Sequence, residues 1–482
     1  MTVTGNLVAG DFLGTGSTDL IEVRDPADLR RTVGKVPAMT VSDVRGVYEA
    51  AREGARVWRA LGPIARGDVL RAAAARLRAE RDGLARIIVG EMGKTLAEAT
   101  TEVTKAADFF DYFGGLARLP FGELVPDARP GTQTRVIREP LGVTLLITPW
   151  NDPLLTPARK AAPALIAGNA VVIKPATLTP LIVLNLARIL HEAGVPAGVV
   201  GTVTGRVREM GDALLDDDAL RAVSFTGSTE IGLDLQRRLA GRPVRLQTEM
   251  GGKNAVAVLA DADLEVAADQ TVAGAFAQAG QRCTATSRLV VVSSVAEPLL
   301  DAVRRRVRAL TVSAGDTPGV DMGPVVSADA RDEIVGHIQR AVDDGSEVVE
   351  GGLEAPADVS EHGAFLRPTV LRVTRDHAIW REEVFGPVLG VLEVDDEEAA
   401  VEAVNDSAYG LSAAVFTNDL GAAERFVDRV EVGQVSVNQP TSGWDIHHPF
   451  GGFGLSGSAF KEQGLDAIRF YTRTKTAAVR AL

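Results

Sequence analysis

The stretch VTLLITPWNDPLLTPARKAAPALIAGNAVVIK, residues 143–174, decides the fold. It opens with an apolar run, 143–148, that is typical of a buried strand. A helical segment follows at 153–168, with Gly168 at its carboxyl-terminal cap, and a second apolar strand follows at 170–174. A strand, a helix and a strand at this spacing form the unit of a parallel sheet, so the sequence predicts an α/β fold.

The same alternation continues along the chain. Residues 40–117 carry apolar side chains at helical spacing, and a further helix is expected at 180–194. Further strands are expected at 199–204, 221–226, 255–260, 288–292, 346–352 and 413–417. Two stretches outside this pattern, 132–142 and the tail 467–482, alternate as strands do. These segments predict one doubly wound parallel sheet and a second alternating region after it.

The charge and composition exclude several classes of protein. Lys and Arg number 51 and Asp and Glu 64, which gives a net charge of −13. Polyanions are repelled on average, so no nucleic acid partner is expected. The six histidines and the single cysteine show no zinc-type spacing, so no metal site is expected.

The single cysteine also bears on the compartment. One cysteine cannot form an internal disulfide, so the chain is not a secreted disulfide scaffold. The N-terminus lacks the basic and then apolar segments of a signal peptide. No apolar run reaches the roughly 18 residues of a membrane span. We therefore expect a cytoplasmic protein with no membrane partner.

Two glycine-containing stretches are candidates for a phosphate-binding loop. Gly452–Gly457 fits the pattern G-x-G-x-x-G, but no strand precedes it and no clear helix follows, so a tight turn is the better interpretation. SFTGSTEIG, residues 224–232, leaves a strand and opens a helix at Gly227 and Ser228. Helix N-termini present free N–H groups to phosphates. The alternative is an ordinary helix cap by Ser228 or Thr229.

The second strand of the opening stretch ends at Lys174, and Thr177 follows three residues later. Ligands of doubly wound sheets bind outside the carboxyl ends of the strands, so both residues are candidates for cofactor contacts. The alternative for Lys174 is an ordinary surface lysine.

Cys283 lies in FAQAGQRCTATSR, residues 276–288. A lone cysteine is usually a small buried apolar residue. Here its surroundings are polar, Gly280 lets the backbone pass close to another group, and Arg282 offers a neighbouring charge that favours a thiolate. Cys283 is therefore a candidate nucleophile.

A nucleophile of this kind needs an anion-stabilising group and often a base. Asn151 follows the strand at 143–148, where its amide could donate to an oxyanion. Glu249 precedes a Gly-Gly pair and could act as a general base. The alternatives are a helix N-cap for Asn151 and a solvated loop acid for Glu249.

Nine motifs together resemble one family, the NAD(P)-dependent aldehyde dehydrogenases. They are REPLGVTLLITPWNDPLL, AGNAVVIKPATLTP, VSFTGSTEIG, QTEMGGKNAVAVL, AGQRCTATSR, MGPVVS, REEVFGPVL, YGLSAAVFT and PFGGFGLSG. They occur in the family's order and cover most of the chain. The resemblance implies two doubly wound parallel-sheet domains and a small oligomerisation sheet.

The resemblance also implies a division of the chain and an assembly. Residues 1–118 and 141–250 would form the cofactor-binding domain, and 251–461 the catalytic domain with the cysteine. Residues 119–140 and 462–482 would form the oligomerisation strands. Because exposed sheet edges are usually paired, a homodimer or homotetramer is expected.

The resemblance implies catalytic roles for three residues. Cys283 would attack an aldehyde to form a thiohemiacetal, whose oxyanion the Asn151 amide and the Cys283 N–H would hold. Hydride transfer to the nicotinamide would leave a thioester, and Glu249 would activate the water that hydrolyses it. Glu249 lies 34 residues before Cys283, as in the family.

The resemblance places the cofactor on a further set of residues. Lys174 would meet the adenosine ribose, Gly227 and Ser228 the pyrophosphate, and Glu383 the nicotinamide ribose. Phe385 and Trp150 would lie beside the nicotinamide end. Members that prefer NAD often carry an acid at the Thr177 position. The threonine therefore predicts that NADP is accepted, and we hypothesise that NADP is the preferred cofactor.

The expected substrate pocket contains Asp152, Trp444, His447 and Phe450. GQRCTATSR resembles the branch that oxidises 2-oxoglutarate semialdehyde and related semialdehydes, but a carboxylate-bearing substrate would be repelled by Asp152. A semialdehyde and an aromatic aldehyde therefore both stay open. Gln278 stands where many members have Asn, and the sequence gives it no role.

Two rival functions also stay open. In a CoA-acylating aldehyde dehydrogenase, CoA rather than water would take the acyl group, but Glu249 favours water. In a non-catalytic scaffold or binding protein, the three residues Cys283, Glu249 and Asn151 would have no reason to occur together.

Overall fold

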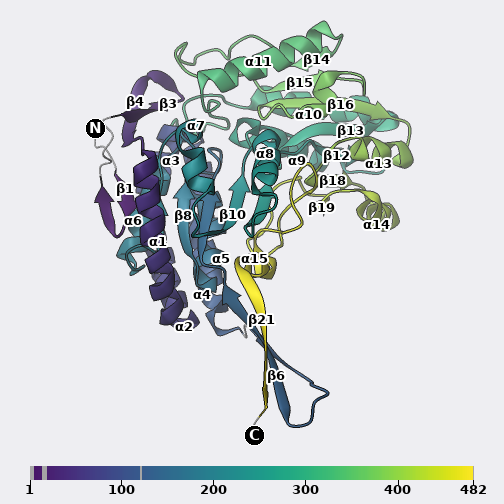
Figure 1. Ribbon diagram of the computed structural model, residues 1–482. Coiled ribbons are helices and arrows are strands. Elements are labelled where there is room, and N and C mark those ends of the chain that lie inside the picture. The colour runs from purple at the N-terminus through teal and green to yellow at the C-terminus, as the bar shows by residue number, and fades with distance from the viewer. Residues whose placement is uncertain (1–4, 14–18, 120–121, 481–482) are drawn as a thin grey trace.

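The protein is described from a computed structural model, which covers residues 5–13, 19–119 and 122–480. Those parts of the expected segments that fall on residues 1–4, 14–18, 120–121 and 481–482 lie outside the described residues. Three larger sheets organise the chain (Figure 1): one of five strands, one of seven and one of three. Shorter two-stranded ribbons flank them.

The five-stranded sheet is parallel throughout, in the order β11-β10-β7-β8-β9. Its strands are β7 (Val143–Ile147), β8 (Ala170–Lys174), β9 (Val200–Thr202), β10 (Leu220–Thr226) and β11 (Arg245–Glu249). The order reverses around β7, which makes the sheet doubly wound. The sequence predicted four of these strands and missed β11, which has mixed polar and apolar residues.

Helices cover both faces of this sheet. Alternate side chains of a strand point to opposite faces, so Leu146 and Ile173 join one core and Leu145 and Val172 the other. The first core is completed by α2 (Pro63–Ala79), α3 (Arg81–Met92), α4 (Leu96–Gly115), α5 (Leu155–Ala167) and α6 (Leu181–Glu192). The second is completed by α1 (Val41–Leu61), α7 (Val207–Leu215) and α8 (Thr229–Leu239). Gly168 closes α5 with φ 100°, in the left-handed conformation expected of a carboxyl-terminal cap.

The seven-stranded sheet has the order β14-β15-β16-β13-β12-β18-β19. Its strands are β12 (Asn254–Val258), β13 (Thr286–Val292), β14 (Glu347–Glu350), β15 (Thr369–Arg372), β16 (Val388–Val394), β18 (Ser412–Phe416) and β19 (Gln434–Val437). All are parallel except β14, which pairs antiparallel at one edge. The helices of this half are α9 (Leu264–Phe276), α10 (Ala296–Ala309), α11 (Ala328–Asp343), α12 (Ala378–Arg381), α13 (Glu397–Asn405) and α14 (Leu420–Arg429).

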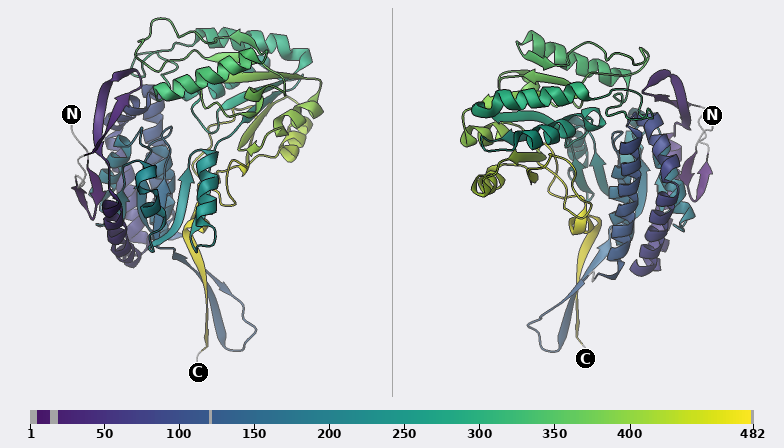
Figure 2. Two further views of the ribbon diagram at one scale, coloured as in Figure 1. Left: turned by 45° about the horizontal axis from the view of Figure 1, so that its top comes forward. Right: turned by 180° about the vertical axis from the view of Figure 1, so that it is seen from behind.

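The three-stranded sheet is antiparallel and projects from the body as an arm (Figures 1 and 2). It consists of β5 (Gly122–Val125), β6 (Thr132–Pro140) and β21 (Thr472–Arg480). Thr472 pairs with Pro140 and Arg480 with Thr132, so the carboxyl-terminal strand runs along the whole of β6. The predicted fold class, two sheets of the doubly wound type and a small third sheet, is confirmed.

The tail differs from its prediction in one part. Residues 464–471 form helix α15 (Gly464–Tyr471), not the start of a strand. This helix packs near α5 and buries four residues in the first core: Ala467, Ile468, Phe470 and Tyr471. The alternating pattern of Thr472–Arg480 alone is that of a strand.

The remaining elements are short. The amino-terminal ribbons are β1 (Asn6–Val8) with β2 (Asp11–Leu13), and β3 (Leu20–Asp25) with β4 (Asp28–Pro37). β17 (Tyr409–Gly410) pairs with β20 (Phe453–Gly454), so the G-x-G-x-x-G stretch at 452–457 forms a short strand and turn, not a loop that opens a helix. Three 3₁₀ turns lie at Leu116–Arg118, Ala277–Gly280 and Ser293–Val295.

Candidate active site

The candidate site lies where the two large sheets face each other. Parallel strands end at one edge, so the segments after β7, β8, β10 and β11 lie along the carboxyl edge of the five-stranded sheet. Lys174 and Glu249 are the last residues of β8 and β11, and the segments after β7 and β10 carry Asn151 and Ser228. The loop with Cys283 leads into β13, at the opposite, amino edge of the seven-stranded sheet.

Cys283 is held by its backbone. The amide of Asn254, at the start of β12, donates from Nδ2 to the carbonyls of Cys283 (2.8 Å) and Ala285 (2.8 Å). Two residues earlier, the buried Gln281 side chain accepts from the Val326 N–H (2.9 Å). The cysteine peptide is therefore fixed by contacts from two separate segments.

Burial raises the pKa of the Cys283 thiol to about 12, and the charge of Arg159 opposes this rise. Asp152, Glu249 and Glu383 raise it further, because a thiolate is disfavoured near other negative charges. The sequence pointed to Arg282 as the favourable cation. In the structure Arg282 donates to the Gln278 amide instead (2.6 Å), and Arg159 has the role expected of Arg282.

Asn151 lies beside the cysteine loop. It is 6% exposed, and its Nδ2 donates to the Gln281 carbonyl (2.9 Å). The helix after it is capped at Leu154 without a side-chain hydrogen bond, so Asn151 is not an N-cap. Its amide contacts Gln281, two residues before Cys283, and can also donate to an oxygen on a group bound to Cys283.

Glu249 ends strand β11 and is 3% exposed, so it is not a solvated loop acid. Neither carboxyl oxygen has a hydrogen-bond partner among the described residues. Burial raises the pKa of Glu249 well above its usual value, as does Glu462, while Lys160 and Arg159 lower it. A carboxyl group with a raised pKa and no partner can exchange a proton with a nearby water.

A buried ion pair lies behind Glu249. Lys160 of α5 donates to Glu462 and to the Ser224 hydroxyl (2.8 Å). Neither charged residue was assigned a role from the sequence. Lys160 is fully buried inside an otherwise apolar helix face, which is the signal that could have found it.

The residues expected to contact the adenosine end of the cofactor lie along the same sheet edge. Lys174 is buried and donates to the Pro175 carbonyl (2.7 Å), and burial lowers its pKa to about 8. It is therefore not the ordinary surface lysine of the alternative. Thr177 is half-buried, and its hydroxyl donates to the Gly205 carbonyl (3.4 Å). Ser228 caps α8, and Gly227 donates to the Glu249 carbonyl (3.1 Å), which holds this helix start to β11.

The residues expected at the nicotinamide end form a second group. Glu383 accepts from the Gly252 N–H (2.9 Å), and burial raises its pKa to about 7. A Cβ at Gly251 would lie 1.9 Å from Glu383 Oε2, so a side chain there would displace the carboxylate. The rings of Trp150 and Phe385 meet edge to face at 5.4 Å.

These two groups fit a nicotinamide dinucleotide. The start of α8 offers N–H donors for a pyrophosphate, and Glu383 offers an acceptor for ribose hydroxyls. The aromatic pair offers an apolar surface for a ring. In the part of the chain that is described, no cluster of His, Cys, Asp and Glu could hold a metal ion.

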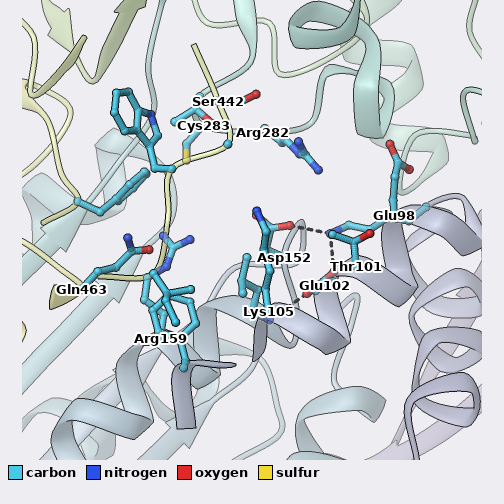
Figure 3. Close-up of a pocket in the computed structure, with 18 residues that line it drawn as sticks. Glu98, Thr101, Glu102, Lys105, Asp152, Arg159, Arg282, Cys283, Ser442 and Gln463 are labelled. Atoms are coloured by element: carbon cyan, nitrogen blue, oxygen red, sulfur yellow. Dashed lines mark hydrogen bonds and ion pairs between the residues drawn. The ribbon is translucent and has the colours of Figure 1, made fainter. Parts of the chain in front are cut away.

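A pocket opens in front of Cys283 (Figure 3). Cys283, Arg282 and Ser442 lie on one side, and Asp152, Lys105 and Arg159 on the other. The lining is polar and charged, with four cations, Lys94, Lys105, Arg159 and Arg282, and three acids, Glu98, Glu102 and Asp152. Its apolar residues include Phe109, Leu155, Trp444, Ile446 and Phe450.

Asp152 is paired within this pocket. Lys94, 1% exposed in its side chain, donates to Asp152 (2.6 Å) and to Glu102 (2.5 Å). Burial tends to raise the pKa of Asp152, but Lys94 and Arg282 hold it well below its usual value. Asp152 is therefore an anion whose charge is already balanced, and the repulsion expected from it is offset.

Arg159 is the cation that the sequence missed. Its guanidinium lies over the Phe450 ring (4.7 Å) and 3.6 Å from Glu462. Asp152, Leu155 and Arg159 follow at helical spacing and all line the pocket, a periodicity that could have revealed it.

The structure places three of the four expected pocket residues, Asp152, Trp444 and Phe450, in the lining. His447 lies outside it, with about half of its side chain exposed and its ring against His448 (4.3 Å). The turn at 445–448 directs His447 outward and Ile446 inward, so Ile446 takes the expected position.

Comparisons with known proteins agree with this geometry. Residues 13–477 match the model of the aldehyde dehydrogenase family. The chain is 41% identical over 456 residues, 94% of both chains, to a 2,5-dioxopentanoate dehydrogenase of Saccharolobus solfataricus.

Two solved structures are also similar. One is an NADP-dependent enzyme from E. coli (34% identity, TM-score 0.95, covering 99% of this chain and 98% of the other). The other is betaine aldehyde dehydrogenase from Staphylococcus aureus in complex with NAD+ (32%, 0.95, 98% and 94%).

The fold and the site define an NAD(P)-dependent oxidoreductase that acts on aldehydes. The chain belongs to the aldehyde dehydrogenase family. Among the described helices, none is long and apolar enough to cross a bilayer.

The raised pKa of Cys283 predicts slow alkylation at neutral pH. Below its pKa the group is mostly a neutral thiol, and the fraction present as the reactive thiolate rises about tenfold with each pH unit. The rate of carbamidomethylation by iodoacetamide, without cofactor, should therefore rise up to about pH 10 and show no plateau near pH 8. Intact mass reports Cys283 without ambiguity because the chain has no other cysteine. A plateau below about pH 8 would mean that the thiolate is already stabilised.

Proposed function

We propose that the protein oxidises a carboxylate-bearing aldehyde, a semialdehyde, to the corresponding acid with NADP or NAD. One observation carries the proposal: half-buried Cys283 lies in a pocket whose lining includes Arg159 and Arg282, and the buried Asn151 amide and Glu249 carboxyl lie close to the cysteine loop, outside that lining.

Three residues carry out the covalent chemistry. The Cys283 thiol gives its proton to water and attacks the aldehyde carbon as the thiolate, and the Asn151 Nδ2 and the Cys283 N–H donate to the resulting oxyanion. When that oxyanion collapses, the carbon loses a hydride and becomes a thioester of Cys283. The bound nicotinamide supplies the acceptor for this hydride.

Glu249 acts in the second half of the reaction. It takes a proton from water as the water oxygen attacks the thioester carbon, and the Cys283 thiolate leaves when the tetrahedral adduct collapses. The acid product carries the water oxygen. Glu249 is suited to this step because its oxygens are free of hydrogen-bond partners among the described residues.

The cofactor contacts are proposed residue by residue. Lys174 and Thr177 lie at the adenosine ribose, Gly227 and Ser228 at the pyrophosphate, and Glu383 at the nicotinamide ribose, with Trp150 and Phe385 beside the ring. Thr177 brings no negative charge to the ribose 2′ position, which supports acceptance of NADP.

The pocket supports a substrate with a carboxylate at the end remote from the aldehyde. Lys94 donates to both Asp152 and Glu102, and Glu98 accepts from two backbone N–H groups, of Thr95 and Gln278. Arg159 and Arg282 are then the cations best placed to pair with a substrate carboxylate. An aromatic aldehyde would bring no acceptor for the guanidinium N–H groups that remain without one. The relative that oxidises 2,5-dioxopentanoate has a substrate of the proposed kind.

The assembly and its division are proposals as well. Residues 1–118 and 141–250 bind the cofactor, 251–461 carry the cysteine, and 119–140 with 462–482 assemble copies of the chain through the arm. Leu124 and Val479, on the outer strands of the arm, are 77% and 55% exposed, as expected of surfaces that pair. Light scattering should give a dimer or tetramer, and a monomer would contradict this.

We place the enzyme in the cytoplasm, which cell fractionation tests.

Glu249→Gln should separate the two halves of the reaction. Without the base, hydrolysis should slow by about 10²–10⁴-fold while hydride transfer continues. Stopped-flow absorbance should show a burst of reduced cofactor equal to the active sites and a slow steady state. Glu361→Gln, at an 88% exposed side chain, is the control and should behave as wild type. Adding CoA should not restore turnover in the variant. If acyl-CoA forms, the CoA-acylating alternative is correct.

Arg159→Met should weaken recognition of the substrate carboxylate. A charge-assisted hydrogen bond contributes about 1.5–3 kcal/mol, so the ratio of kcat/KM for 2,5-dioxopentanoate to that for pentanal should fall by about 10–100-fold. Pentanal has the same chain length and no carboxylate. Any effect of the substitution on the reactivity of Cys283 therefore changes kcat/KM for both aldehydes and cancels in the ratio. An unchanged ratio would exclude Arg159 from substrate binding.

The cofactor preference is tested at Thr177. Wild type should use NADP at least as well as NAD by kcat/KM. Thr177→Glu should lower kcat/KM for NADP by about tenfold or more, because a carboxylate repels the 2′-phosphate, and should leave NAD little changed. A wild-type enzyme with strong NAD preference would contradict the proposal.

A further inference from the structure

Gln278 lies between the oxyanion donor and an arginine of the pocket. We propose that Gln278 is a positioning residue: its amide orients Arg282 toward the carboxylate of the substrate and fixes the peptide that carries Asn151. The first part rests on the proposed semialdehyde substrate. The sequence alone gave this residue no role.

The Gln278 amide joins two segments. Its Nε2 donates to the Asn151 carbonyl (2.6 Å) and lies 3.3 Å from Asp152 Oδ1. Its Oε1 accepts from Arg282 Nε (2.6 Å). One side chain, 2% exposed, therefore links the loop after β7 to the loop before β13.

The backbone of Gln278 adds a third segment. Its N–H donates to Glu98 Oε1 (2.6 Å) in the first turn of α4, and Glu98 itself belongs to the capping box of that helix. A buried side chain held at both ends in this way has little freedom to rotate. The groups that its amide contacts are therefore held in a fixed position relative to the pocket.

Arg282 is held at one nitrogen and is free at the others. Its Nε is used by Gln278, and in the described parts of the chain the terminal guanidinium nitrogens have no hydrogen-bond acceptor. Figure 3 shows the guanidinium extending into the pocket between Cys283 and the side that carries Asp152 and Glu98. A planar guanidinium whose edge between the two terminal nitrogens is free is suited to a carboxylate.

The backbone at Gln278 favours other residues. Gln278 (φ 58°, ψ 29°) and Ala279 (φ 54°, ψ 36°) are both left-handed, and Gly280 follows at φ 67°. Such a conformation costs an L-residue with a Cβ about 1–2 kcal/mol, and Asn tolerates it better than Gln. Asn, however, is one methylene shorter, so its amide would fall about 1.5 Å short of Arg282 and of Asn151. The longer side chain is present despite the backbone cost, which indicates that the contacts of its amide matter.

Gln278→Asn separates these two effects. It keeps an amide and suits the left-handed backbone, so the relief of strain should offset the buried hydrogen bonds that are lost, and the melting temperature should change little. The contacts to Arg282 and Asn151 should be lost. The KM for 2,5-dioxopentanoate should rise by about tenfold, and kcat should fall for both 2,5-dioxopentanoate and pentanal because the oxyanion donor is less well placed. Ala279→Gly is the control, because it relieves the same strain and leaves the Gln278 amide in place.

The outcomes are distinct. If wild type does not prefer 2,5-dioxopentanoate over pentanal, the proposed substrate class is wrong, and so is the orientation of Arg282 toward it. If wild type has the preference and Gln278→Asn keeps it with an unchanged kcat, the role of Gln278 is wrong. A loss of melting temperature with equal effects on both substrates would mean a purely structural role. A larger KM effect on 2,5-dioxopentanoate at an unchanged melting temperature supports the proposal.

Discussion

The parallel pairing of β7 with β8 and β10, and of β10 with β11, is the constraint on which the site depends. Parallel strands have their carboxyl ends at one edge, so residues distant in sequence are brought together there. Asn151, Lys174, Ser228 and Glu249 come to that edge from four different strands. The cysteine loop needs only to approach this edge from the second sheet to complete the site.

Burial decides the chemistry at that edge. It raises the pKa of both Cys283 and Glu249, which favours the neutral forms of the proposed nucleophile and base before substrate binds. Arg159 favours the charged form of each, and it also faces the pocket. The same guanidinium can therefore assist the thiolate and bind an anionic substrate, which links reactivity to the kind of aldehyde in the pocket.

Much of this could be predicted from sequence, because its signals are local. Apolar runs at 143–148 and 170–174 gave β7 and β8, and the polar surroundings of Cys283 marked it as unusual. Three features depend on contacts distant in the chain: the pairing of Lys94 with Asp152, the outward turn of His447 and the link from Gln278 to Asn151. The helix at 464–471 was missed because its apolar spacing was interpreted together with the alternation of the strand after it.

The proposed reaction depends most on Cys283 as the covalent acyl carrier. The direct test is to quench Glu249→Gln with acid during turnover of 2,5-dioxopentanoate and to map its tryptic peptides. Cleavage after Arg282 and Arg288 releases CTATSR, with Cys283 at its start. We predict the acyl mass on this peptide, and its absence when the acid-quenched protein is treated with hydroxylamine, which cleaves thioesters, before digestion. An acyl group on another peptide, or turnover with no adduct and undiminished activity in Cys283→Ser, would contradict the account.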